Sequence, residues 1–177
     1  DNSCLFVMGS EGRGEQLLKT DQDNGLVLRD GYSVPAHLDA ICQRFSAVLA
    51  RFGYPECPGR IMVSNPDWRG TASAFGQRVR QWLLQPEGDS LMQLASFLDA
   101  HAVAGDATLL AAVREGVAAL ATDNDAVLAR FAAPVENFDG PTGWWSRLFG
   151  LGDEGRAISL KKAGIFPIVH GVRSLAL

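Results

Sequence analysis

Two aspartates stand one residue apart near the start of the chain, in the segment TDQDN. Asp21 and Asp23 fall where we predict that a strand begins, and the two-residue period of a strand directs both side chains to the same face. Two carboxylates on one face repel each other unless a cation lies between them. Hard oxygen ligands favour Mg²⁺, which keeps several waters and binds phosphate oxygens. The pair therefore predicts a Mg²⁺ site, with Mn²⁺ as the alternative ion.

About a dozen residues earlier, Gly9 ends the apolar run CLFVMG, which we predict to be a buried strand, and Ser10 follows it. A glycine lets a phosphate approach the backbone, the serine offers a hydroxyl, and amides at the start of a helix favour negative charge. Arg13 adds a cation for a phosphate. The arrangement suggests one site, in which the turn holds the triphosphate of a nucleotide and the aspartates hold the metal. Two metal ions could stabilise the attacking and leaving oxygens of an in-line displacement.

Other phosphate and metal motifs do not fit these residues. A P-loop requires Lys and Ser or Thr after its second glycine, but Glu15 and Gln16 follow Gly14, and the dinucleotide fingerprint G-x-G-x-x-G is absent. A calcium loop that starts at Asp21 would need a glutamate at its twelfth position, which is Tyr32. An isolated DxD or Gly-Ser pair is more often a solvated turn. The prediction therefore depends on both motifs in this order, each next to an apolar strand.

The remaining patterns indicate which elements position these residues. In the first half we expect a short helix within 12–18, a strand at 21–28 and a helix at 34–53. A strand or extended segment at 61–65, a turn at 66–70 and a helix at 71–85 follow. Within 90–105 we expect a helix and then a strand that carries Asp99. The second half is nearly all helical, with a break near 122–125. These patterns predict an α+β fold, with a small mixed sheet and its helices over 1–115 and a helical domain over 116–177.

Bulk properties narrow the function classes. The 177 residues are 47% hydrophobic and 20% charged, which is typical of a globular protein with a substantial core. The net charge of -4 argues against non-specific binding to nucleic acid, and no apolar run is long enough for a membrane span. Three widely spaced cysteines argue against a disulfide framework or a zinc site and favour the reducing cytoplasm. Both ends lie in apolar segments, so we expect a fragment of a longer chain.

The segment GSEGRGEQLLKTDQDN resembles the signature of the nucleotidyltransferase superfamily, which has the DNA polymerase beta-like fold. More closely, it resembles nucleotidyltransferases fused to CBS and cyclic-nucleotide-binding domains and related to PII-protein uridylyltransferase. Later segments are similar to that family too: CPGRIMVSNPDWRGT, FLDAHAVAGDATLL, PTGWW and ISLKKAGIFPIVHGVRSLAL. The resemblance implies transfer of a nucleoside monophosphate from an NTP to an acceptor hydroxyl. It also implies a protein acceptor, such as a tyrosine on a PII-like signalling protein, and fused regulatory domains.

The same resemblance implies a third carboxylate, which matches Asp99 by position, as metal ligand or base. Two residues depart from the family pattern: His101 stands where an arginine is usual, and Ser159 stands where an aspartate usually precedes Leu-Lys. Lys161 is either solvated or a phosphate contact, and we include it in the predicted nucleotide site. The departures leave open a second function, a nucleotide-binding regulatory module with weakened catalysis that is coupled to fused sensory domains.

Overall fold

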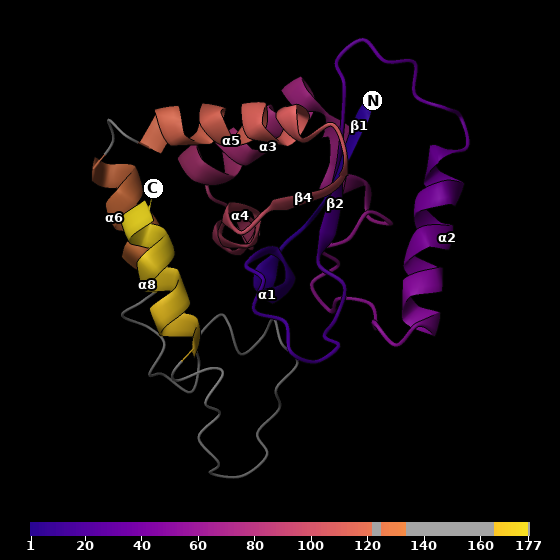
Figure 1. The fold of residues 1–177 in the computed structure, drawn as a ribbon. Coiled ribbons are helices and arrows are strands. Elements are labelled where there is room, and N and C mark those ends of the chain that lie inside the picture. The colour runs from indigo at the N-terminus through magenta and orange to yellow at the C-terminus, as the bar shows by residue number, and fades with distance from the viewer. Residues whose placement is uncertain (122–124, 134–164, 177) are drawn as a thin grey trace. The chain divides into compact units, whose positions relative to one another are not determined.

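The computed structural model describes residues 1–121, 125–133 and 165–176 (Figure 1). The chain divides into two compact units, Asp1–Val117 and Ala118–Leu177. The first contains a four-stranded mixed sheet and its helices, while the described part of the second is helical. The predicted α+β fold class is confirmed.

The sheet has the strand order β3-β2-β1-β4. In its centre β1 (Ser3–Val7) runs antiparallel to both β2 (Asn24–Leu28) and β4 (His101–Gly105), and β2 runs parallel to β3 (Arg69–Thr71). The register pairs Val7 with Asn24 and with His101. The last residue of β1 therefore meets the first residues of β2 and β4, so the segments around Gly9, Asp23 and Asp99 come to one end of the sheet.

The helices of the first unit are α1 (Gly9–Gly12), α2 (Leu38–Arg51), the 3-10 helix η1 (Pro66–Trp68), α3 (Ala72–Leu84), α4 (Ser90–Leu98) and α5 (Ala107–Ala121), whose last turn crosses the unit boundary. Helix α3 begins as its sequence suggests, since the Thr71 hydroxyl accepts a hydrogen bond from the amide of Ala74.

An aromatic cluster forms the core between the sheet and helices α3 and α4. The Phe6 ring of β1 lies edge-on to Phe75 of α3 and Phe97 of α4, with ring centroids 5.8 and 6.1 Å apart. Trp68 and Phe75 are fully buried in the same cluster. Gly25, the cross-strand neighbour of Phe6, makes room for this ring, because a Cβ there would lie 2.2 Å from the Phe6 Cζ. Gly25, which follows TDQDN, is therefore required for the packing of Phe6 in the core.

Several predicted elements differ from the structure. The expected short helix within 12–18 is instead α1 at 9–12, and residues 13–20 are not helical. The expected turn at 66–70 contains η1 and the start of β3, whereas 61–65 is not a strand. Asp99 is not carried by a strand, because it ends helix α4 and β4 begins two residues later. Strand β3 spans only Arg-Gly-Thr, which has no alternation of apolar residues, and its partner β2 is far away in the sequence.

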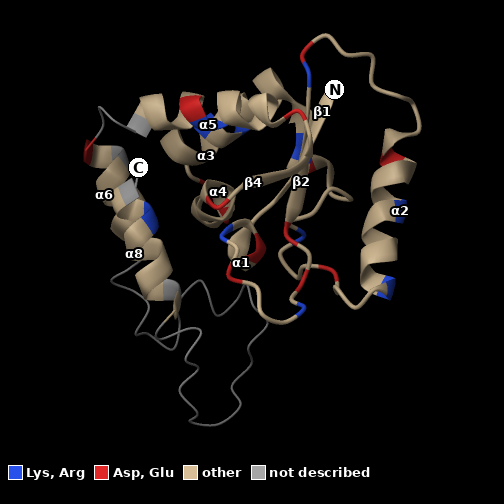
Figure 2. Cartoon of the chain, viewed as in Figure 1, with Lys and Arg blue, Asp and Glu red and all other residues tan. Residues whose placement is uncertain are grey.

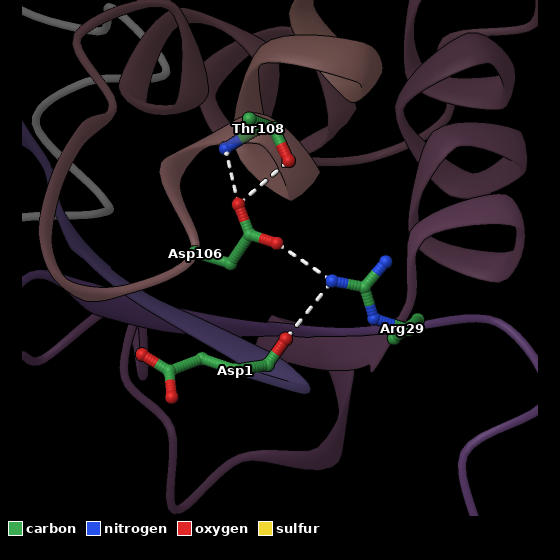
Figure 3. Close-up of polar contacts among 4 residues, drawn as sticks. All are labelled: Asp1, Arg29, Asp106 and Thr108. Atoms are coloured by element: carbon green, nitrogen blue, oxygen red, sulfur yellow. Dashed lines mark hydrogen bonds and ion pairs between the residues drawn. The ribbon is translucent and has the colours of Figure 1, made fainter.

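Asp106 begins helix α5 and links it to the other end of the sheet (Figure 3). One carboxylate oxygen accepts hydrogen bonds from the Thr108 amide at 3.0 Å and hydroxyl at 2.6 Å, and the other pairs with Arg29 Nη2 at 2.6 Å. That same nitrogen donates to the carbonyl of Asp1 at 2.9 Å. Asp106 is therefore the N-cap of α5, and the hydrogen bonds from Thr108 lower the pKa of its carboxyl.

In the second unit α6 (Asp125–Ala132) packs against α8 (Phe166–Ala176). His170 is fully buried there: its ring lies 4.7 Å from that of Phe131, and its Nε2 lies 2.7 Å from the Phe131 carbonyl oxygen. Burial lowers the pKa of His170. His170 is therefore a packed residue in the interior of the second unit. Among the helices that the structure describes, none is long and apolar enough to cross a membrane.

Candidate functional site

The strand predicted at 21–28 is shorter in the structure, because β2 begins at Asn24 and Asp21 and Asp23 lie just before it. Burial still alternates over this segment: the two aspartates are half-buried, whereas Gln22 between them is buried. Its Nε2 donates hydrogen bonds to the carbonyl oxygens of Ser46 in α2 at 3.0 Å and of Tyr54 at 2.9 Å. Gln22 therefore anchors the segment before β2 inside the protein and leaves both carboxylates on the opposite face.

The segment 55–61 lies against the same strand start and places Cys57. The amide of Gln22 donates to the Pro55 carbonyl at 2.9 Å, and the amide of Asn24 donates to the Ile61 carbonyl at 3.1 Å. These two backbone bonds hold the segment at both ends, with Cys57 between them. The sequence TDQDN thus supplies two carboxylates and, with its other residues, fixes the loop that faces them.

Asp21, Asp23 and Cys57 form a cluster in which one carboxylate oxygen of each aspartate and the Cys57 Sγ all lie within 4.8 Å of one another. Cys57 is 6% exposed. Burial, and after it the negative charge of Asp23, raises the pKa of the thiol, so Cys57 is a neutral thiol when no cation is bound. Cys57 was not among the predicted site residues, since the spacing of the cysteines gives no sign of an approach to the aspartates.

The Gly-Ser turn lies against Asp23, one member of the aspartate pair. Gly9 has a φ of 61°, and a Cβ at this position would lie 3.0 Å from the Oδ2 of Asp23. The amide of Met8 donates to the carbonyl of Asp23 at 2.9 Å, which fixes the two segments to each other. Gly9 and Ser10 are the first residues of α1, where backbone amides have no acceptor within the helix. The structure therefore brings the predicted phosphate turn and one predicted metal ligand into direct contact.

Arg13 and Asp99 lie together beside this turn. The Arg13 Nη1 pairs with the Oδ2 of Asp99, and its Nε and Nη2 contact the Glu15 carboxylate at 2.9 and 2.8 Å. The side chain of Asp99 is 4% exposed and that of Arg13 is 23% exposed. A Cβ at Gly12 would lie 2.1 Å from the Asp99 carbonyl oxygen, so α1 packs directly on the end of α4. Asp99 is next to the phosphate turn but is not a member of the three-residue cluster.

Charged residues are concentrated near this turn: acidic and basic segments gather around α1 and the nearby end of β2 (Figure 2). The other predicted site residues do not lie in the contacts described above. His101 is exposed at the start of β4. Lys161 and Ser159 lie outside the described residues.

Comparison with sequence families agrees with this geometry. Residues 1–89 match the family model described as "Putative nucleotidyltransferase DUF294". The chain belongs to this family. Residues 125–177 match a second model, described as "Putative nucleotidyltransferase substrate binding domain". Comparisons with curated proteins and with solved structures gave no match.

The DUF294 match contains the turn at Gly9, the aspartate pair and Cys57, whereas Asp99 lies beyond residue 89. The family assignment supports nucleotidyl transfer as the general function. Nucleotidyltransferases generally use a divalent metal, and the residues present fit one. A point within about 2.8 Å of all three ligand atoms exists, because they lie within 4.8 Å of one another. Metal–oxygen bonds are about 2.1 Å and metal–sulfur bonds about 2.3 Å long, so side-chain shifts of about half an ångström bring Asp21, Asp23 and Cys57 to one ion.

Proposed function

We propose that the chain transfers a nucleoside monophosphate from an NTP to an acceptor hydroxyl and releases pyrophosphate. The approach of Gly9 to the Asp23 carboxylate carries this proposal, because a triphosphate on the turn would lie next to the carboxylate pair. In the reaction the acceptor oxygen forms a bond to the α-phosphorus while the bond from that phosphorus to pyrophosphate breaks. The hydroxyl proton passes to a neighbouring carboxylate or to water.

Each residue of the site has a role in this proposal. The backbone amides of Gly9 and Ser10, with the Ser10 hydroxyl, would bind the β- and γ-phosphate oxygens. Asp21 and Asp23 would hold Mg²⁺, or Mn²⁺ in its place. A divalent ion bound there neutralises phosphate charge and stabilises the attacking and leaving oxygens.

Arg13 and Asp99 would act together. Arg13 is the cation beside the turn, and we propose that it exchanges Asp99 for a phosphate oxygen when the nucleotide binds. The exchange would free the Asp99 carboxylate to complete the metal site or to accept the proton of the acceptor hydroxyl. Lys161, which we predict from sequence alone, would add a further phosphate contact.

The acceptor that we propose is a protein hydroxyl, such as a tyrosine of a PII-like signalling protein in the cytoplasm. The family resemblance supports this choice, and the "substrate binding domain" match over 125–177 supports a separate part of the chain for the acceptor. Fused regulatory domains would then connect the transfer to signal transduction.

The test measures pyrophosphate release and acceptor labelling with each α-labelled NTP, Mg²⁺ or Mn²⁺, and candidate PII-like proteins. Asp21→Asn and Asp23→Asn should each lower turnover by at least about a hundredfold, since loss of transition-state charge stabilisation costs this order of rate. Asp89→Asn is the matched control, because Asp89 is an exposed aspartate whose side chain makes no cap hydrogen bond. Full activity of the Asp21 or Asp23 variants would refute the proposed roles.

A regulatory nucleotide-binding module is the second candidate, and one observation favours it. Arg13, the cation beside the turn, already contacts two carboxylates, those of Asp99 and Glu15. A site with its cation neutralised in this way favours reversible nucleotide binding over strong stabilisation of a transition state. Binding of a labelled NTP with neither pyrophosphate release nor acceptor labelling would support this function over catalysis.

A further inference from the structure

We propose that Cys57 is the third protein ligand of the metal held by Asp21 and Asp23. Its sulfur would make the site bind ions that accept thiolate, such as Zn²⁺ and Co²⁺, more tightly than Mg²⁺. This inference rests on the proposed metal-dependent function and deepens it, because it concerns which ion the site selects.

The position of the sulfur carries the first step. The Cys57 Sγ lies within 4.8 Å of one carboxylate oxygen of Asp21 and one of Asp23, and these two oxygens also lie within 4.8 Å of each other. An ion can therefore be placed within about 2.8 Å of all three atoms, and a shift of the side chains by about half an ångström brings both oxygens and the sulfur to bonding distance. In the part of the chain that the structure describes, no other group of three His, Cys, Asp or Glu side chains is as close.

The backbone around Cys57 is fixed, which is the second step. Its carbonyl accepts a hydrogen bond from the amide of Arg60 at 2.8 Å, and Arg60 adopts a φ of 54° in this turn. The turn is itself attached to the strand start through Pro55 and Ile61. The thiol therefore faces the aspartates from a preorganised loop, as a metal ligand requires.

The other two cysteines show what is distinctive about Cys57. All three are buried and free, and a buried cysteine usually packs as a small apolar side chain. Cys4 and Cys42 are not in a cluster with two acidic groups, whereas Cys57 packs against two carboxylates and its thiol is hydrogen-bonded to that of Asp23. A divalent ion between the carboxylates would replace this hydrogen bond by a bond to the sulfur.

The binding step balances simply. The thiol loses its proton to solvent, the sulfur forms a bond to the divalent ion, and the ion keeps its oxidation state. No oxidant or reductant takes part.

The test titrates the 177-residue chain with Co²⁺ and follows the near-ultraviolet charge-transfer band that a cobalt–thiolate bond produces. We expect this band in the wild-type chain, its loss in Cys57→Ser, and a fall in Co²⁺ affinity of about tenfold or more. Affinity for Mg²⁺, measured by calorimetry, should change much less. Cys42→Ser is the matched control, because it removes a buried thiol that lies outside the cluster, and it should keep the band.

The outcomes separate this inference from the proposed function. Binding of Co²⁺ to the wild-type chain without a thiolate band would overturn the role of Cys57 and leave the two aspartates as ligands. Absence of any Co²⁺ and Mg²⁺ binding would overturn both proposals. If Cys57→Ser does not fold, a wild-type chain that binds Co²⁺ without the band still overturns the inference, and a band that persists in both Cys4→Ser and Cys42→Ser assigns the sulfur to Cys57.

Discussion

Arg13 and Asp99 form an ion pair across 86 residues of sequence, and it joins the phosphate turn to the end of α4. The Asp99 side chain is 4% exposed, so its charge depends on Arg13 for compensation. The ion pair holds the Arg13 guanidinium beside the phosphate turn, and it engages the carboxylate of Asp99, the third carboxylate predicted for the site.

Replacement of Arg13 by glutamine should weaken both folding and nucleotide binding. Asp99 would remain as a buried carboxylate without its cation, at a cost of about 1–3 kcal/mol in the free energy of unfolding. Loss of the phosphate contact should raise the Kd for NTP by about ten- to 150-fold, because a hydrogen bond to a charged group contributes about 1.5–3 kcal/mol. Urea denaturation and titration with a fluorescent NTP measure the two effects.

The double variant Arg13→Gln/Asp99→Asn is the control for this prediction. It removes the stranded charge, so it should recover most of the stability but none of the nucleotide affinity. Equal stability of Arg13→Gln and the wild-type chain would contradict the importance of the pair.

Substitution of Gly9 by alanine should disturb the metal site itself. The new Cβ would lie 3.0 Å from the Oδ2 of Asp23, and the residue would keep a positive φ. Gly14→Ala is a closely matched control, since Gly14 has a φ of 69° and a Cβ there meets nothing within 4 Å. Both variants should lose about 1–3 kcal/mol of stability from backbone strain. Metal affinity, measured by calorimetry, should fall only in Gly9→Ala, and an equal fall in both would contradict the contact.

Local patterns were sufficient to predict the parts of the site that depend on one segment. The common face of Asp21 and Asp23 was predicted from the period of two, and burial alternates over 21–24 although β2 begins only at Asn24. Gly9 was predicted to form a turn after the first strand, and it has a positive φ there. Each is decided by the residues within a few positions of it.

The parts that sequence reasoning missed depend on distant partners. Cys57 reaches the aspartates because backbone bonds from Gln22 and Asn24 hold its loop, and nothing in the spacing of the three cysteines indicates those bonds. Strand β3 exists because its three residues pair with β2, not because of their side-chain pattern. The place of Asp99 at a helix end, and its pairing with Arg13, also arise only in the folded chain.

Removal of the Gln22 side chain should lower the stability of the protein and displace the loop that carries Cys57. In Gln22→Ala the carbonyls of Ser46 and Tyr54 lose their donor, which should cost about 1–3 kcal/mol of stability because both bonds are buried or partly buried. Tyr54 directly precedes the loop with Cys57, so losing the bond to its carbonyl should shift the loop although its backbone bonds to Gln22 and Asn24 remain, and the cobalt–thiolate band should weaken. Gln43→Ala is the control, since it removes one partly buried bond, to the Ser64 carbonyl. An unchanged band in Gln22→Ala would contradict this role.

Stability at low pH should depend on Asp106. Its folded-state pKa lies below the ordinary value of 3.8 because Thr108 and then Arg29 stabilise the carboxylate (Figure 3). A depressed pKa contributes stability that is fully present above the ordinary pKa, and this contribution is lost as the pH falls through the folded-state value. The difference in unfolding free energy between the wild-type chain and Asp106→Ala should therefore be constant near pH 7 and shrink steadily below about pH 4. Urea denaturation from pH 7 to pH 3 measures this difference, with Asp89→Ala as the exposed control. A difference that stays constant down to pH 3 would mean that the hydrogen bonds of Asp106 do not favour its charged form.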